Sequence, residues 1–111
     1  MHPPEVVREI LSAFWKIHIL HHAAEGPIAG HWMLKELREH GYDISPGTLY
    51  PLLKRMTARG WLERLPSEGG PKDPQLHRIT DEGRGVLQLV RAQLAELTRE
   101  IEAETRNSRD R

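Results

Sequence analysis

Hydrophobic residues recur three and four positions apart through the first half of the chain, which is the spacing of one face of a helix. The pattern predicts helices over residues 4–24 and 28–40, and a third helix that begins at Pro46. The flanking residues agree with these limits, because Ser45 suits an N-cap, proline suits the first helical position and Gly41 suits a helix C-terminus.

The first helix is expected to pack on two sides. Its main apolar stripe consists of Val7, Ile10, Leu11, Phe14, Ile17 and His21. Three further residues flank this stripe, namely Trp15, Ile19 and Leu20. A second apolar face requires a second packing partner. In the second helix, the residues expected to face inward are Ile28, Trp32, Leu34 and Leu37.

The third helix is predicted to have one apolar and one polar face. The apolar face contains Leu49, Leu52, Leu53 and Met56. The opposite face contains Gly47, Tyr50, Pro51, Lys54 and Ala58, with Arg55 on its flank. Pro51 lacks an amide hydrogen and its ring crowds the carbonyl of Gly47. We therefore expect a bent first turn that tilts Tyr50 outward.

A hairpin and a long helix are predicted to complete the chain. Residues 61–65 and 76–80 are predicted strands, and the proline- and glycine-rich segment between them forms the hairpin tip. Thr80 is placed to cap the last helix. Apolar positions in that helix form a heptad seam, the pattern of a helix that packs on a partner helix. The seam consists of Leu87, Val90, Leu94, Leu97 and Ile101.

These elements predict a mainly α (α+β) fold, a winged helix-turn-helix with a long C-terminal dimerisation helix. We expect a DNA-binding domain over residues 4–80, a dimerisation helix over residues 81–105 and a disordered tail over residues 106–111. A single terminal helix has little in its own chain to cover five apolar positions. Dimerisation through the seam is therefore favoured over packing within the monomer, and Phe14 is expected to join that interface.

The composition excludes several classes of protein. The 111 residues include no cysteine, so disulfides and thiolate metal sites are absent. Sixteen basic residues balance sixteen acidic ones, but residues 44–65 hold four cations and one carboxylate, whereas residues 81–104 hold three cations and six carboxylates. There is no apolar run long enough to cross a membrane and no signal-peptide pattern, so a cytoplasmic location is expected.

The order of three helices and a hairpin indicates contact with double-stranded DNA. In a winged helix-turn-helix, the helix after the turn enters the major groove and the hairpin tip reaches the neighbouring backbone. The candidate DNA-binding residues are Ser45, Gly47, Thr48, Tyr50, Pro51, Lys54, Arg55 and, in the wing, Lys72. The alternative is a solvated helix face. Arg59 and Arg64 are weaker candidates for DNA contact, with pairing to Glu63 or solvent as the alternative.

The run EGPIAGHWMLKELREHGYDISPGTLYPLLKRMTARGWLERL, followed by GGP and HRITDEGR, resembles the PadR family of bacterial transcriptional regulators. The segment GTLYPLLKRM is the most specific part of this resemblance. The resemblance implies a homodimeric repressor that binds an inverted-repeat operator and is released by a small effector. Effectors in the family bind between the first and last helices, so Trp15 is a candidate to stack on a hydrophobic or aromatic ligand, with plain core packing as the alternative.

Histidines in the first helix suggest a second hypothesis. His18 and His22 are four residues apart, a spacing that can chelate one metal ion. His21 lies beside them and His31 can approach from the next helix. No cofactor is required by the first hypothesis, but a regulator that responds to zinc or a similar divalent metal is an alternative. Amphipathic packing is the other explanation for these histidines.

A third hypothesis is a winged-helix module that binds proteins and not DNA. The neutral net charge and the weakly basic wing favour it. An enzyme is not expected, because the sequence shows no nucleophile motif, no phosphate-binding loop and no carboxylate pair in a plausible cleft.

Overall fold

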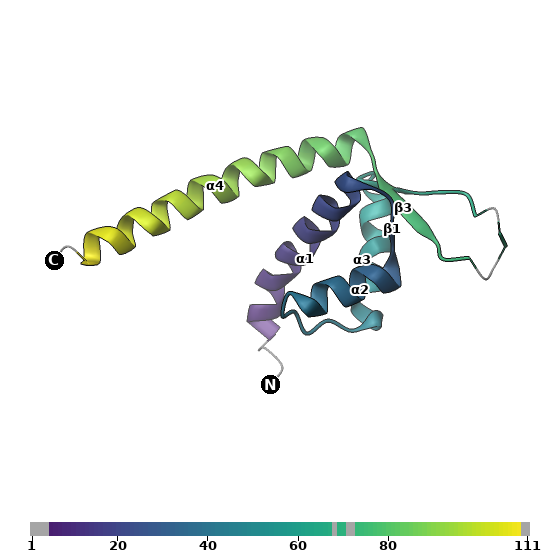
Figure 1. Cartoon of the computed structure of the whole chain (residues 1–111), viewed down its shortest axis with the longest axis horizontal. Helices are drawn as coiled ribbons and strands as arrows, with labels where there is room; N and C mark the ends of the chain where they lie inside the picture. Colours follow the sequence, from purple (N-terminus) through teal and green to yellow (C-terminus); the bar gives the residue numbers. More distant parts are fainter. Residues whose placement is uncertain (1–4, 68, 71–72, 110–111) are drawn as a thin grey trace.

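The computed structural model describes residues 5–67, 69–70 and 73–109. Three helices form the body of the molecule, and a fourth leaves it as a long rod (Figure 1). The helices are α1 (Glu5–Glu25), α2 (Gly30–Glu39), α3 (Pro46–Ala58) and α4 (Asp81–Arg109). Three short strands, β1 (Ile28–Ala29), β2 (Leu62–Arg64) and β3 (Leu76–Ile79), pair antiparallel in the order β1-β3-β2. The predicted fold class, a winged helix with a long C-terminal helix, is confirmed.

The hydrophobic core lies between the three body helices and the sheet. The inner face of α3 is as predicted, because its four apolar residues are all at most 2% exposed. Met33 and Leu37 of α2 are completely buried, and Leu62 of β2 is 1% exposed. None of the described helices combines the length and the apolarity needed to cross a membrane.

The face of α1 that enters the core differs from the predicted main stripe. Trp15, Ile19 and Leu20, which we expected to flank that stripe, are at most 4% exposed. Val7 and Ile10 of the stripe are 41% and 61% exposed. The helix does have two apolar faces, but spacing alone does not show which face meets its own chain. One face is therefore packed in the core. The other is covered only in part, because Leu11 packs against the core whereas Val7, Ile10 and Phe14 are exposed.

The predicted start of the second helix, at residue 28, was wrong. Ile28 and Ala29 are extended and pair with His77 and Leu76 of β3, so α2 begins only at Gly30. A two-residue strand is too short to leave a period in the sequence. Pairing with the hairpin, a contact that is distant in the sequence, decides the conformation of this segment.

Of the four residues expected to face inward here, Ile28 and Leu37 are buried and Leu34 packs against the core, but Trp32 was placed wrongly. Trp32 is 44% exposed, whereas the next residue, Met33, is buried. The Trp32 ring packs edge-on against His22 of α1, with 5.3 Å between the ring centroids. Gly41 lies just past the helix with a φ of 91°, as its role at the C-terminus requires.

The junction of the wing and α4 is formed as predicted. Thr80 Oγ1 accepts a hydrogen bond of 3.0 Å from the amide of Gly83, which is the N-cap contact. At its other end, α4 continues to Arg109, past the end expected at residue 105 and into the segment expected to be disordered. Residues 105–109 contain neither glycine nor proline, and Arg106 suits the negative end of the helix dipole.

Candidate nucleic-acid interface

The turn between α2 and α3 is held by a small set of specific contacts. The amide of Tyr42 donates to the carbonyl of Leu37 at 3.1 Å, which closes the end of α2. Arg38 Nε donates to the carbonyl of Ile44 at 3.0 Å, and the Ile44 side chain is 1% exposed. A buried anchor and two hydrogen bonds thus fix where α3 starts relative to α2, which is the geometry that a helix-turn-helix needs.

The start of α3 presents small residues to solvent. Ser45 is the N-cap in extended conformation, and Pro46 occupies the first turn, as predicted. The Ser45 hydroxyl donates to Thr48 Oγ1 at 3.3 Å and makes no side-chain capping bond. Gly47 is exposed, and its amide is among those of a first turn that have no intrahelical partner. This end of α3 can therefore accept an anion such as a phosphate.

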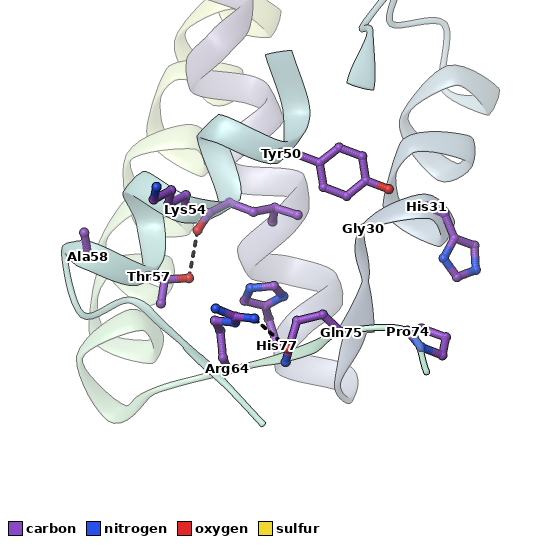
Figure 2. A pocket seen from close by; sticks show the side chains of 11 residues that line it. Gly30, His31, Tyr50, Lys54, Thr57, Ala58, Arg64, Pro74, Gln75 and His77 are labelled. Carbon is purple, nitrogen blue, oxygen red and sulfur yellow. Dashed lines mark hydrogen bonds between the residues drawn. The ribbon is translucent and has the colours of Figure 1, made fainter. Parts of the chain in front are cut away.

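Tyr50 owes its position to a glycine in α2. Figure 2 shows the Tyr50 ring reaching toward the first turn of α2 next to Gly30. A Cβ atom at Gly30 would lie 2.5 Å from Tyr50 Cε1, so only glycine leaves room for the ring. Tyr50 is 48% exposed, with its neighbour Pro51 inside a helix that continues to Ala58. The predicted bend at Pro51 stays a prediction.

A groove of about 650 Å³ lies between α3, the start of α2 and the wing (Figure 2). Its lining consists of Gly30, His31, Tyr50, Leu53, Lys54, Thr57, Ala58, Arg64, Pro74, Gln75 and His77. Lys54 and Arg64 are cationic, and none of these described lining residues is acidic. The groove is therefore basic although the whole chain is neutral. A polyanion would meet no carboxylate there.

The wing residue Arg64, a weaker candidate from the sequence, lines this groove. Its Nη2 donates to Gln75 Oε1 at 2.8 Å, and Gln75 Nε2 donates in turn to the carbonyl of Leu65 at 2.8 Å. Glu63, the expected partner of Arg64, pairs with Arg78 at 2.6 Å. Side chains alternate across a strand, so neighbours in β2 point to opposite faces of the hairpin. Arg64 is the functional candidate that sequence spacing undervalued.

His77 of β3 closes the floor of the groove. Its side chain is 8% exposed, and Nδ1 is buried with no hydrogen-bond partner among the described residues. Burial, and then the positive charge of Arg64, lower the pKa of His77 below its ordinary value. Both effects favour the neutral form of His77, and the permanent charges of the groove are those of Lys54 and Arg64.

The structure places the predicted DNA-binding residues in three different settings, with one more outside the described residues. Tyr50 and Lys54 line the groove beside the wing. Thr48 and Arg55 line a different hollow against α1, together with the carboxylates Glu5 and Glu9 and three further residues. Ser45, Gly47 and Pro51 are exposed on α3. Lys72 lies outside the described residues. Arg59, the other weaker candidate, places its guanidinium 5.4 Å from the centre of the Trp61 ring.

The residues predicted for dimerisation on α4 form a stripe whose side chains become more exposed toward the C-terminus. Leu87 is 3% exposed in the core, but Leu97 and Ile101 are 51% and 54% exposed. Between them, Val90 and Leu94 are half-buried. Phe14 of α1 is 37% exposed, whereas Trp15, the effector candidate, is 4% exposed and packs in the core. Trp15 also lines the hollow against α1 that contains Thr48 and Arg55, and its role toward an effector stays a prediction.

The histidines predicted as metal ligands do not all lie in one cluster. Nitrogen atoms of His18 and His22 lie within 4.8 Å of each other and of His40, which the sequence analysis did not select. His31 is not part of this cluster and lines the groove next to Tyr50. His40 follows the last residue of α2, far from α1 in sequence. Only the packing of the two helices brings it to His18.

The comparisons with known proteins agree with this geometry. Residues 19–89 match the model of the transcriptional regulator PadR-like family. The transcriptional regulator Rv3488 of Mycobacterium tuberculosis is 42% identical over 95 residues, which cover 86% of this chain and 89% of that protein.

Solved structures from other bacteria have the same fold. A PadR family transcriptional regulator from Eggerthella lenta superposes with a TM-score of 0.72 at 34% identity, and covers 86% of this chain and 85% of that one. A PadR-like transcriptional regulator from Bacillus cereus gives a TM-score of 0.74 at 26% identity, with 85% and 93% of the two chains covered.

Proposed function

This chain belongs to the PadR-like family of transcriptional regulators, and we propose that it is a repressor that binds an inverted-repeat operator as a homodimer. In this proposal α3 enters the major groove and the wing contacts the adjacent backbone. A small hydrophobic or aromatic effector then releases the operator.

The observation that carries the proposal is the basic groove at α3. Lys54 of α3 and Arg64 of the wing line it together with Tyr50, and no described lining residue is acidic. The opposite side of the hairpin differs, because the hollow there contains four carboxylates, among them Glu63 and Asp81, against two arginines, Arg78 and Arg84. DNA that approached from the α3 side would therefore meet cations first. This segregation of charge, and not the net charge, favours DNA over a protein partner.

The exposed apolar stripe supports the homodimer. An inverted-repeat operator presents two equal half-sites, and two recognition helices engage them when they are about 34–36 Å apart. A two-fold contact through the outer half of α4 would set that distance and would cover Leu97 and Ile101. An effector would act by favouring a dimer with a different spacing. Its effect is limited to the difference between its affinities for the two states.

The test is fluorescence anisotropy with labelled DNA from upstream of the gene that encodes this protein, measured at several salt concentrations. We expect Lys54→Ala to weaken binding about tenfold. It should also reduce the slope of log K against log salt by about 0.9, which is the loss of one phosphate contact. Arg84→Ala removes the same charge on the opposite side of the hairpin and should leave the slope unchanged. A protein-interaction module would instead show no salt-dependent binding in any variant.

A second prediction concerns the position of Tyr50. In Gly30→Ala the new methyl group must displace the Tyr50 ring, whose Cε1 would lie 2.5 Å from it. Because this ring is on the surface and can rotate, we expect about a tenfold loss of DNA affinity with a change in unfolding free energy below about 1 kcal/mol. Gly26→Ala is the control, since a Cβ there has no neighbour within 4 Å. Equal affinity of the two variants for DNA would contradict a role for Tyr50.

A further inference from the structure

We propose that His18, His22 and His40 form a binding site for a divalent transition-metal ion of the zinc class. The site would join the middle of α1 to the residue that follows α2. Each histidine offers one ring nitrogen, and these nitrogens all lie within 4.8 Å of one another. Metal binding by these residues does not depend on the proposed function in DNA binding.

The three rings come from two elements that pack together. His18 and His22 are one turn apart on α1, with their ring planes 16° apart. The ring of His40 lies 5.2 Å from that of His18, measured between centroids. A tetrahedral zinc site with Zn–N bonds of about 2.0–2.1 Å needs donor atoms about 3.3–3.4 Å apart. Rotation of the three side chains would bring their nitrogen atoms to this separation. The side chain of His40 is exposed and therefore has room to rotate.

Glu36 provides the carboxylate that such sites commonly contain. Its Oε1 lies 3.2 Å from His40 Nε2 and 3.6 Å from His22 Nε2. In this position it can hold the ring of His40 in one orientation or complete the coordination of the ion. The ring of Tyr42 packs edge-on against His18, at 5.2 Å between centroids, and fixes that ring from the other side.

A second cluster, formed by His21, His22 and Glu25, is a weaker candidate. His21 Nδ1 lies 2.7 Å from the guanidinium of Arg91 in α4, and His21 Nε2 lies 3.0 Å from Glu25 Oε1. Both ring nitrogens of His21 are therefore already engaged. A permanent cation beside one of them repels a metal ion.

The imidazole of His18 is suited to metal binding. Imidazole must be neutral to coordinate a metal ion. Burial, followed by the neighbouring rings of His40, His22 and His21, lowers the pKa of His18, whereas Glu36 opposes this shift. Nitrogen ligands favour Zn²⁺, Co²⁺, Ni²⁺ and Cu²⁺ over Mg²⁺ and Ca²⁺. Three protein ligands would leave a coordination position for Glu36 or water.

The test is calorimetric titration of the full chain with Zn²⁺ alone, after treatment with a chelator. We expect one ion per chain, and at least about a tenfold loss of affinity in His40→Ala and in His18→Ala. His21→Ala and His31→Ala should retain affinity within about twofold. Titration with Co²⁺ gives a second readout, because tetrahedral coordination produces strong visible absorption that His40→Ala should remove.

His40 is the decisive position, since it is exposed at a helix end and its replacement leaves the core intact. Far-ultraviolet circular dichroism of the metal-free variant verifies this. Wild-type zinc affinity in His40→Ala would overturn the proposed site. Loss of binding in His21→Ala, with His40→Ala unaffected, would also overturn it and would assign the ion to the second cluster.

Discussion

Replacing Leu97 and Ile101 together by glutamate is expected to leave the protein monomeric and to lower its affinity for operator DNA by about 100-fold or more. Both side chains are more than half exposed in the single chain, so their replacement removes nothing from its core. In the proposed dimer, the same positions place two carboxylates in an apolar seam, where unpaired charge costs several kcal/mol. A monomer then binds one half-site at a time and loses the avidity of about 10²–10⁴ that a linked second site provides.

The matched control adds the same two charges to the other side of α4. Ala92 and Ala103 are exposed and lie on the helix face opposite the seam. The variant Ala92→Glu with Ala103→Glu should remain dimeric and bind DNA as the wild type does. Sedimentation equilibrium gives the oligomeric state, and anisotropy at fixed salt gives the affinity. A Leu97→Glu, Ile101→Glu protein that is dimeric with full affinity would contradict dimerisation through α4.

The sequence predicts α3 well because local rules and tertiary packing agree there. Ser45 and Pro46 define the start of the helix, and the spacing of its leucines leaves one clear inner face. In α1 the same rules are ambiguous. Phe14 and Trp15 are adjacent and belong to different apolar faces, yet Trp15 is 4% exposed and Phe14 is 37% exposed. Only the position of α2 and α3 decides between the two faces.

The parts of the candidate site that were missed depend on contacts between distant residues. Arg64 and Gln75 are eleven positions apart and meet only when the hairpin closes. Gly30 matters because the Tyr50 ring lies against it, a contact across the turn between two helices. His40 joins His18 for the same reason. In each case the residue types are evident from the sequence, but the distance between the two residues is not.

The position of α4 relative to the wing would determine where the second recognition helix of a dimer lies, and a close contact at Gly83 holds the first turn of α4 there. A Cβ atom at Gly83 would lie 2.2 Å from the carbonyl oxygen of Trp61 and 2.8 Å from Ile79 Cγ1. That carbonyl is fixed, because it accepts a hydrogen bond of 3.0 Å from the amide of Thr80. The Thr80 hydroxyl in turn donates to the carbonyl of Gly60. The first turn of α4 is thus packed against backbone that has little freedom to move.

We therefore expect Gly83→Ala to lower the free energy of unfolding by about 2–3 kcal/mol, the cost of overpacking against rigid atoms. Gly85 is in the same helix, but a Cβ there has no neighbour within 4 Å, so Gly85→Ala should raise this free energy by about 0.5–1 kcal/mol. Urea unfolding of both variants at equal protein concentration measures the difference. Both variants replace glycine by alanine in the same helix, so the gain from helix propensity is about the same in both. The difference between their free energies of unfolding therefore measures the contact with Trp61. Equal stabilisation of both variants would mean that the contact at Gly83 does not hold the first turn of α4 on the wing, and this contact could then not help to set the spacing of two half-sites.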